Sequence, residues 1–587
     1  MRKQTPVQIP LLAYRTLLKN YLKPQWPGVV FLSVLLFSSI GLELFTPQLL
    51  RTFIDSALAG QRLPILLRIA LLFLGATLVQ QGTLVGTTYL SEQIGWTATN
   101  QLRLELTRHC LQLDLPFHHI HPPGELIERL DGDLTTLSNF FSAFVVRLLG
   151  SALLLIGVLL ALLQEDWRVG LIFICFSLGA LIVLRQFRRR AAPFWLAGRQ
   201  ASGILFGFLE EQLAGLKDLR ANGASGYSLH RWRQVLQTQV VRQRSARMMS
   251  EVISSTSSTL LALGYVGALA FGAALFEGGR ITLGAVYLIG YYISLLLTQL
   301  RQINLQMDDL QKASASLERV QALFQTLSAV QDGPGAALPA GAPSVEFQHV
   351  SFGYTPDHLI LHNLSFRLEP GRILGVLGHT GSGKTTLARL LARLYDPLFG
   401  QVLLDGVDLR QMRLATLWQH IGLVTQEVQL FHASVRDNLS FFDGAISDEQ
   451  LIAALNLLGL AEWYEALPVG LATEIGPGGS GLSAGEAQLL TLARLLLKNP
   501  SLVILDEASS RLDPVAEHRL EQAIRHVLQR RTGIIIAHRL ATLQHVDDLL
   551  ILEQGHMIEY GKREQLAQDP DSHYSRLLRL GLEEELA

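Results

Sequence analysis

The chain has 587 residues, well beyond the roughly 100–200 of a typical single domain, so two or more domains are expected. It carries 49 Lys and Arg against 50 Asp and Glu, a net charge of −1, which argues against a nucleic-acid binder held by bulk charge. Only 17% of the residues are charged and the mean hydropathy is +0.28, which argues against a wholly soluble or a disordered protein. Two cysteines exclude a disulfide scaffold, and no Cys/His cluster has zinc-site spacing.

The N-terminal stretch is basic, with five Lys or Arg and no acid in the first 27 residues. No small-residue cleavage site follows a short apolar core, so we predict no secretory signal. Residues 10–26, PLLAYRTLLKNYLKPQW, are predicted to form a short amphipathic helix that lies along a membrane surface.

Six charge-free stretches follow within the first 300 residues, at 24–42, 69–91, 148–164, 169–184, 252–276 and 281–300. A membrane span needs about 20 apolar residues, with a range of roughly 17–25. A soluble α-protein with buried helices is the alternative, but no soluble fold needs so many such stretches. We therefore predict membrane-spanning helices near 28–50, 66–90, 144–163, 168–187, 256–276 and 281–300.

The distribution of basic residues predicts the orientation of these spans. Residues 185–257 hold twelve Lys or Arg against four acids, whereas the short connections near 51–65, 164–168 and 277–280 hold four together. Basic segments stay on the cytoplasmic side, so both termini are expected inside the cell. Glu43 is the one acid well inside a span, which makes it a candidate for substrate binding or simply for the outer interface.

The two connections on the cytoplasmic side, about 91–143 and 188–255, are far longer than turns and keep helical periodicity. Two helices of about 25 residues would reach roughly 37 Å below the membrane. We expect glycine to break helix at Gly124 and Gly223, which allows short turned elements at the far tips. Plain loop connectors are the alternative.

A second domain is expected after a Gly/Pro/Ala-rich stretch at 332–343. From Ser344 the pattern changes to alternating strands and then to an α/β series. The expected organisation is an N-terminal segment over 1–27, a helical membrane domain over 28–327, a linker over 328–343 and an α/β domain over 344–587.

The α/β domain contains a phosphate-loop pattern, Gly378-x4-Gly383-Lys384-Thr385, between an apolar strand and a helix. Its glycines let the backbone wrap a polyphosphate, and the helix N-terminus adds positive potential. Lys384 is expected to reach the β and γ phosphates, and Thr385 to offer a hydroxyl to Mg²⁺. The sequence therefore predicts a nucleotide site.

Two later strands end in residues that can bind a metal ion or take part in catalysis. Leu502-Val-Ile-Leu ends at Asp506, which suits Mg²⁺, and Glu507, which can polarise an attacking water as a general base. Thr532-Gly-Ile-Ile-Ile-Ala precedes His538, which could contact a γ-phosphate or position that water. Solvated strand ends and a structural histidine are the alternatives.

The order of these motifs resembles an ATP-binding cassette. Tyr354 matches the aromatic that stacks on adenine, Gln426 matches the glutamine that joins Mg²⁺ to the membrane domain, and Leu482–Glu486 matches the signature loop. Asp506 and Glu507 match the Walker B pair. Ser510–Asp513 match the loop that follows this pair, and His538 matches the switch histidine. Six spans before one cassette resemble a half-transporter of the multidrug, lipid and peptide exporter family. Segments 124–133 and 211–223 resemble its coupling regions, and the likeness covers about 10–587.

The resemblance implies six membrane-spanning helices with long cytoplasmic extensions, followed by an α/β P-loop NTPase cassette. It implies ATP-driven export of a hydrophobic or amphipathic substrate, such as a drug, lipid or peptide, across the inner membrane by a two-state cycle. The implied partners are a second half-transporter and membrane lipids. It places catalysis on Glu507 and His538, Mg²⁺ on Thr385, Gln426 and Asp506, and ATP on Tyr354, Gly378, His379, Thr380, Gly381, Ser382, Gly383, Lys384, Thr385, Thr386, Gln426, Ser483, Gly485 and Glu486.

The chain departs from the family pattern around the signature loop. Ala484 adds a Cβ where close backbone approach is wanted, and Glu486 places a carboxylate where a glutamine sits near ATP. Ala487-Gln-Leu489 replaces the Arg-Gln-Arg of the family, and Gly476-Pro477 lacks the acid that helps link the family's cassette to its coupling segments. Two interpretations stand: one half of an asymmetric heterodimer, or drift within a homodimer.

The sequence argues against two rival functions. A membrane regulator or channel-like protein would bind ATP without transport, but it has no need of a base such as Glu507. A soluble cassette enzyme of nucleic-acid repair would lack the six spans, so no nucleic-acid partner is expected.

Overall fold

The computed structural model describes residues 19, 21–339, 341–355, 357–506, 514–537 and 543–580. The chain divides into two compact units. The helical unit comprises 123–326 and the described part of 1–111, and the cassette unit comprises 112–122 and the described part of 327–587. Most of the surface helix predicted over 10–26 lies outside the described residues.

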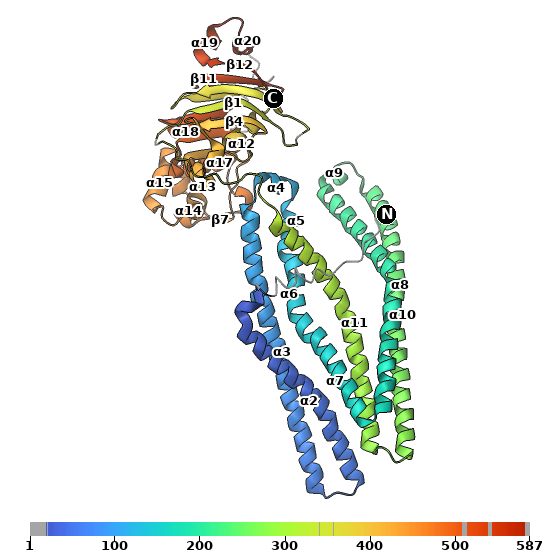
Figure 1. Ribbon diagram of the computed structural model, residues 1–587. Coiled ribbons are helices and arrows are strands. Elements are labelled where there is room, and N and C mark those ends of the chain that lie inside the picture. The colour runs from blue at the N-terminus through green and yellow to red at the C-terminus, as the bar shows by residue number, and fades with distance from the viewer. Residues whose placement is uncertain are drawn as a thin grey trace. The chain divides into compact units, whose positions relative to one another are not determined.

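Within the described residues, six helices are long and apolar enough to cross a membrane, as the charge-free stretches predicted (Figure 1). These helices lie within Lys23–Leu58, Leu63–Gln112, Arg147–Glu165, Trp167–Ala214, Ser225–Glu277 and Leu283–Ile303. The elements of the helical unit are η1 (Lys23–Gln25), α2 (Trp26–Leu58), α3 (Leu63–Gln112), α5 (Pro123–Ile127), η2 (Glu128–Asp133), α6 (Leu134–Ala143), η3 (Phe144–Leu149), α7 (Gly150–Glu165), α8 (Trp167–Ala214), α9 (Leu216–Ala221), α10 (Ser225–Glu277) and α11 (Leu283–Gln325).

Several of these helices continue far beyond their charge-free stretches, as expected for cytoplasmic extensions. Helices α3, α8 and α10 have 50, 48 and 53 residues, so each is roughly 70–80 Å long against a bilayer core of about 30 Å. Helices α8 and α10 run side by side (Figure 1). Gly223, with φ +64°, turns the chain between α9 and α10, as predicted.

The predicted helix break at Gly124 is wrong, because Gly124 lies inside α5. The chain instead leaves helical geometry at His121, which has φ −110° and ψ 99°. Pro122 follows, and a residue before proline is driven out of the helical region by the proline ring. The Pro122-Pro123 pair therefore ends one helix and opens the next.

The core of the helical unit lies where α7, α8, α10 and α11 pack together. Tyr292 of α11 is among its largest fully buried side chains. Its hydroxyl donates to the carbonyl of Leu44 at 2.9 Å and accepts from Gln48 Nε2 at 3.0 Å, so α2 is tied to this core. Nearer the cytoplasmic end, Arg319 pairs with buried Asp133 and joins α11 to η2.

The cassette unit alternates strands and helices after the short helix α4 (Leu115–Ile120). Its strands are β1 (Val345–Phe352), β2 (Leu361–Leu368), β3 (Ile373–Leu377), β4 (Phe399–Leu404), β5 (Val407–Asp408), β6 (Ile421–Val424), β7 (Ala433–Ser434), β8 (Glu474–Ile475), β9 (Leu502–Asp506), β10 (Thr532–Ile536), β11 (Asp548–Glu553) and β12 (His556–Lys562). Its helices are α12 (Lys384–Leu391), η4 (Leu409–Gln411), α13 (Leu414–His420), α14 (Val435–Ser440), α15 (Asp448–Leu457), α16 (Ala461–Glu465), η5 (Gly470–Ala472), η6 (Pro477–Gly479), α17 (Ala484–Lys498), α18 (Pro514–Leu528), α19 (Arg563–Gln568) and α20 (His573–Leu580).

Among the described residues, the main sheet has the order β12-β11-β3-β10-β9-β6, and β12 alone is antiparallel to its neighbour. A second, antiparallel sheet has the order β2-β1-β4-β5. Two buried apolar clusters share the main sheet's strands, as is typical of a parallel sheet covered on both faces. The α/β fold predicted for this part of the chain is confirmed.

Candidate functional site

The phosphate-loop residues connect β3 to α12 in a tight turn. A Cβ on Gly378 would come within 2.2 Å of the carbonyl oxygen of Leu552 and 2.6 Å of Ser382 Oγ, so only glycine fits there. Gly383, with φ +101°, forms the N-cap of α12 in the left-handed region that favours glycine. Ser382 Oγ is buried without a hydrogen-bond partner. The loop is thus a backbone cradle at a helix N-terminus, which is the geometry that binds phosphate.

Lys384, the first residue of α12, is buried and folds back over this loop. Its Nζ donates to the carbonyls of Gly378 at 2.5 Å and His379 at 3.0 Å. The ammonium group therefore lies over the cradle. His379, Thr380 and Gly381 form the exposed part of the loop.

Tyr354 lies beside α12 and is 38% exposed. Its hydroxyl lies 3.2 Å from Thr386 Oγ1 and accepts from Arg389 at 2.8 Å. Tyr395 packs edge-on against its ring, with centroids 5.1 Å apart. The structure thus brings the predicted base-stacking aromatic to the helix that follows the phosphate loop.

The carboxyl ends of the parallel strands bring further predicted residues to the same sheet edge. Asp506 ends β9 and pairs in register with Ile536 of β10, which in turn pairs with Val376 of β3. Its carboxyl group is buried. Gln426 follows β6, the other neighbour of β9, and is exposed. Together with the Thr385 hydroxyl these groups offer oxygen donors, the ligands that Mg²⁺ prefers.

The two predicted catalytic residues, Glu507 and His538, lie outside the described residues, as does the loop over 510–513. Asp506 and Ala537 are the last described residues before Glu507 and His538, and both lie at the same edge of the sheet. Their placement by the sequence therefore stays a prediction.

The signature loop begins helix α17 with a reciprocal capping arrangement. Ser483 is the N-cap, and its Oγ accepts from the backbone N–H of Glu486 at 3.3 Å. The Glu486 carboxylate accepts from the backbone N–H of Ser483 at 2.8 Å. Gly485 is buried behind them, and Ala484 is exposed. The negative charge predicted for this loop is therefore fixed at the start of α17, where a helix dipole favours it.

Sequence reasoning missed Arg494, which ties α17 to the segment after Gln426. Its guanidinium donates to the carbonyls of Asn438 at 2.6 Å and Gln429 at 2.9 Å and lies over the ring of Phe441. Burial lowers the pKa of Arg494 to about 10, so the group stays charged at neutral pH. Nothing in the sequence pattern marks a buried cation on the apolar side of this helix.

Sequence reasoning also missed the role of Asp114. Its carboxylate caps α4 by accepting from Phe117 N at 3.1 Å. It also accepts from Ser328 Oγ at 2.9 Å, from Val330 N at 3.0 Å and from Ala329 N. Burial alone raises the pKa of Asp114, but these hydrogen bonds outweigh burial and hold the pKa below its usual value. An Asp followed by Leu115-Pro116 is a helix-start signal that could have revealed the cap.

The likeness of 124–133 to a coupling region stays a prediction. Within the same connection, residues 112–122, with α4, group with the cassette unit. Residues 128–133 form η2 in the helical unit, where Asp133 binds Arg319.

Comparisons with known proteins agree with these observations. Residues 29–300 match the model of the ABC transporter transmembrane region, and residues 361–510 match that of the ABC transporter. A fatty acid ABC transporter ATP-binding/permease protein of Mycobacterium tuberculosis is 30% identical over 79% of this chain and 74% of that protein. An ATP-dependent lipid A-core flippase of Legionella pneumophila (strain Paris) is 28% identical over 99% of this chain and 98% of its own.

Among solved structures, a bacterial Atm1-family ABC exporter with ATP bound is similar, with a TM-score of 0.82 and 25% identity. The match covers 95% of this chain and 98% of that one. Fold and motifs thus define a membrane-embedded ATPase that couples hydrolysis to transport. The chain belongs to the ABC transporter family, as a half-transporter of the exporter type with six membrane-spanning helices and a cytoplasmic ATP-binding cassette.

Proposed function

We propose that the chain exports an amphipathic substrate across the cytoplasmic membrane as one half of a dimeric transporter. ATP would draw two cassettes together and turn the helical units outward. Hydrolysis and product release would return them inward, so that the cycle alternates between two states of different ATP affinity. The names of the fatty acid and lipid A-core relatives support an amphipathic substrate.

In the proposed ATP site, Tyr354 stacks on adenine and the backbone of 378–383 surrounds the phosphates. Lys384 exchanges its contacts with the loop carbonyls for contacts with the β and γ phosphates. Thr385, Asp506 and Gln426 would hold Mg²⁺, which neutralises phosphate charge when bound. Glu507 takes a proton from the attacking water, and His538 positions that water near the γ-phosphate.

The capping arrangement of Ser483 and Glu486 supports pairing with a different half. In a dimer of cassettes, each ATP lies between one chain's phosphate loop and the other chain's signature loop. Here the amide and the hydroxyl of Ser483 are both engaged by Glu486, whose carboxylate would face a partner's nucleotide. Because like charges repel at short range, the site completed by this signature loop would hydrolyse ATP poorly. The site that uses this chain's phosphate loop and Glu507 would be the active one.

Co-expression with a candidate partner half, followed by steady-state ATPase measurement, tests this proposal. The double variant Ala484→Gly with Glu486→Gln should change turnover by less than about twofold, because the ATP site that this signature loop completes contributes little to hydrolysis. Glu507→Gln in the same pair should lower turnover by about 10²–10⁴-fold, as loss of a general base does. Full substrate-stimulated ATPase from this chain alone would contradict the heterodimer and favour a homodimer.

A further inference from the structure

The ring of Tyr354 is attached to helix α12 through its hydroxyl group. The hydroxyl oxygen accepts a hydrogen bond from Arg389 Nη1 at 2.8 Å. Because the oxygen is the acceptor in that bond, its own proton is free to bond Thr386 Oγ1, which lies 3.2 Å away. Thr386 and Arg389 stand three residues apart, so both lie on one face of α12. The helix therefore uses the hydroxyl both as a donor and as an acceptor.

Two buried rings hold Tyr354 from the body of the cassette. The ring centroid of Phe352 lies 5.3 Å from that of Tyr354 and the centroid of Tyr395 lies 5.1 Å from it, and both rings stand nearly at right angles to Tyr354. Phe352 and Tyr395 are buried, whereas Tyr354 is 38% exposed. Such edge-to-face contacts favour one ring orientation, and the exposed part of Tyr354 remains available to a nucleotide base.

Arg389 approaches the hydroxyl of Tyr354 rather than a face of the ring. Its guanidinium carbon lies 5.8 Å from the ring centroid, well beyond the roughly 3.5–4.0 Å between stacked groups in contact. The cation therefore leaves room for a base against the ring. Within the part of the chain that the structure describes, no carboxylate lies within ion-pair distance of Arg389, so its bond to Tyr354 has no acidic competitor.

Helix α12 also begins at the phosphate loop. Lys384 and Thr385 lie in its first turn, and Arg389 lies five residues beyond Lys384, about 7.5 Å along the helix axis. One helix thus carries the residues proposed for the phosphates and the residues that hold the ring proposed for the base. A ring that is fixed before the ligand arrives loses less freedom on binding than a ring that can rotate.

We propose that Arg389 is a positioning residue of the ATP site and acts through Tyr354. Its hydrogen bond holds the ring in the orientation in which adenine stacks, at a fixed distance from the phosphate loop at the start of α12. Arg389 neither touches the nucleotide nor takes part in hydrolysis. This inference rests on the proposed ATP site and adds a residue that lies outside the Gly-x4-Gly-Lys-Thr pattern.

Binding of AMP-PNP, a poorly hydrolysed ATP analogue, to the full chain in lipid nanodiscs tests this role. Arg389→Ala should weaken AMP-PNP binding about 3–10-fold, because the ring must then be ordered when the base binds. Tripolyphosphate, which has no base, should bind Arg389→Ala and the wild-type chain equally well. In hydrolysis by the assembled transporter, the KM for ATP should rise by a similar factor while kcat changes less than about twofold, as expected when only binding is lost.

Variants of Tyr354 show whether Arg389 acts through the ring. Tyr354→Phe keeps the ring but removes the hydroxyl, so it should weaken AMP-PNP binding about as much as Arg389→Ala. The two changes together should cost no more than either one alone, because both break the same bond. Arg389→Lys keeps a donor for the hydroxyl and should recover part of the affinity.

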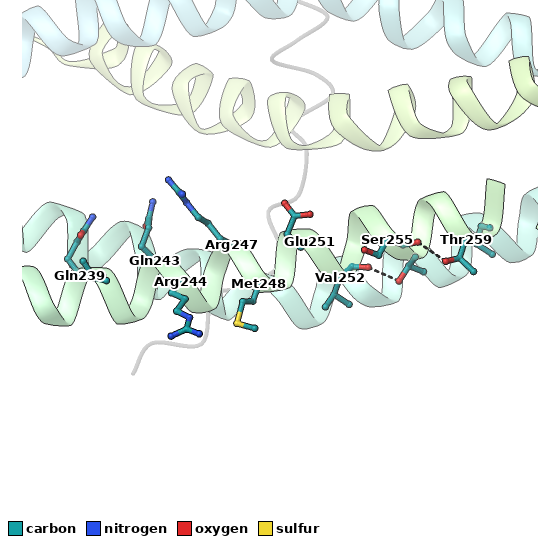
Figure 2. Close-up of a pocket in the computed structure, with 12 residues that line it drawn as sticks. Gln239, Gln243, Arg244, Arg247, Met248, Glu251, Val252, Ser255 and Thr259 are labelled. Atoms are coloured by element: carbon teal, nitrogen blue, oxygen red, sulfur yellow. Dashed lines mark hydrogen bonds between the residues drawn. The ribbon is translucent and has the colours of Figure 1, made fainter. Parts of the chain in front are cut away.

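Arg244→Ala is the control for the loss of an arginine charge. Arg244 is an exposed residue that lines a cavity of about 1150 Å³ along α10, in the helical unit. Figure 2 shows that it points away from the row formed by Gln243, Arg247 and Glu251. Since Arg244 has no part in the cassette, Arg244→Ala should leave AMP-PNP binding unchanged.

Additive losses in the double variant of Arg389→Ala and Tyr354→Phe would overturn the inference, since Arg389 would then act independently of the ring. Unchanged AMP-PNP binding in Arg389→Ala would also overturn it, and so would an equal loss for tripolyphosphate or in Arg244→Ala. Tyr354→Ala, which removes the ring, should weaken AMP-PNP binding about 10–100-fold. Normal binding in Tyr354→Ala would refute the proposed base site itself, whereas a failure confined to Arg389 leaves that site intact.

Discussion

At the scale of single residues, Lys384 shows how the ATP site is held ready. Its ammonium group is buried and donates to two carbonyls of its own loop. Lys384→Ala should therefore weaken ATP binding about 10–100-fold, because a charge-assisted contact to phosphate is lost. Equilibrium titration with a fluorescent ATP analogue measures this. Lys217→Ala, which removes a lysine from the helical unit, is the control, and an equal loss in that variant would contradict the assignment.

Arg494 makes a different prediction, about stability. Arg494→Ala leaves the buried carbonyl of Asn438 and the carbonyl of Gln429 without their donor, so we expect a loss of about 1–3 kcal/mol in the free energy of unfolding of the cassette. Urea unfolding followed by the fluorescence of the cassette measures it. The matched change Arg519→Ala on the exposed side of α18 should cost less than about 0.5 kcal/mol. Similar urea midpoints of unfolding for Arg494→Ala and Arg519→Ala would refute the role of Arg494 in tying α17 to the segment after Gln426.

The phosphate loop could be predicted well from the sequence, because glycine and lysine at this fixed spacing allow few backbone conformations. For Glu486 the sequence analysis predicts a carboxylate near ATP but not its hydrogen bond with the N–H of Ser483. The Ser-x-x-Glu pattern of a capping box was present in the sequence but was read only for its charge.

At the scale of elements, Asp114 holds α4 to the segment that leads into the cassette. Asp114→Ala removes three hydrogen bonds to residues 328–330, so hydrogen exchange at the amides of Ala329 and Val330 should quicken at least about tenfold. Ser447→Ala, which removes the cap of α15, leaves those amides untouched and serves as the control. Unchanged exchange in Asp114→Ala would show that the carboxylate does not hold this segment.

The same contact predicts a pH dependence. Because the pKa of Asp114 is lower in the folded chain than in the unfolded one, its ionised form stabilises the fold above the unfolded pKa of about 3.9. This stabilisation is lost as the pH falls through the folded pKa. Protection of Ala329 and Val330, corrected for intrinsic exchange, should persist at pH 5 and decline below about pH 4. A decline already complete at pH 5 would contradict the direction of the shift.

Element boundaries show where the sequence was insufficient. The long polar helices were predicted from periodicity, and α8 and α10 confirm them. The sequence analysis predicts the break before α5 at Gly124, although glycine tolerates a helix and the residue before Pro122 does not. Periodicity does not predict the short helix α4, because six residues give no periodic signal.

At the scale of the whole molecule, the spans were the most secure prediction. Charge-free stretches near 20 residues long are rarely found outside membrane spans. Each one corresponds to a long apolar helix in the described residues. The packing of these helices, including the hydrogen bonds of Tyr292, depends on contacts far apart in the chain and could not be predicted from local patterns.

The orientation gives a labelling prediction. With Cys110 and Cys175 replaced by Ser, single cysteines at Ala59 and Gly278, which follow α2 and α10, should react with an impermeant thiol reagent added outside intact cells. Cysteines at Asn222 and Ala337 should react only after the cells are opened, since those positions lie on the basic, cytoplasmic side. All four positions are exposed, so access to side chains is matched. The reverse pattern would refute the orientation.

The central claim is that ATP hydrolysis at this chain's phosphate loop and Glu507 powers export. The most direct measurement follows hydrolysis and the uptake of an amphipathic substrate together, in the same proteoliposomes, for the wild-type transporter and for Glu507→Gln. We predict that hydrolysis falls about 10²–10⁴-fold in the variant and that transport falls in parallel, while ATP binding persists. Hydrolysis at the wild-type rate in Glu507→Gln, or transport that continues without hydrolysis, would contradict the account.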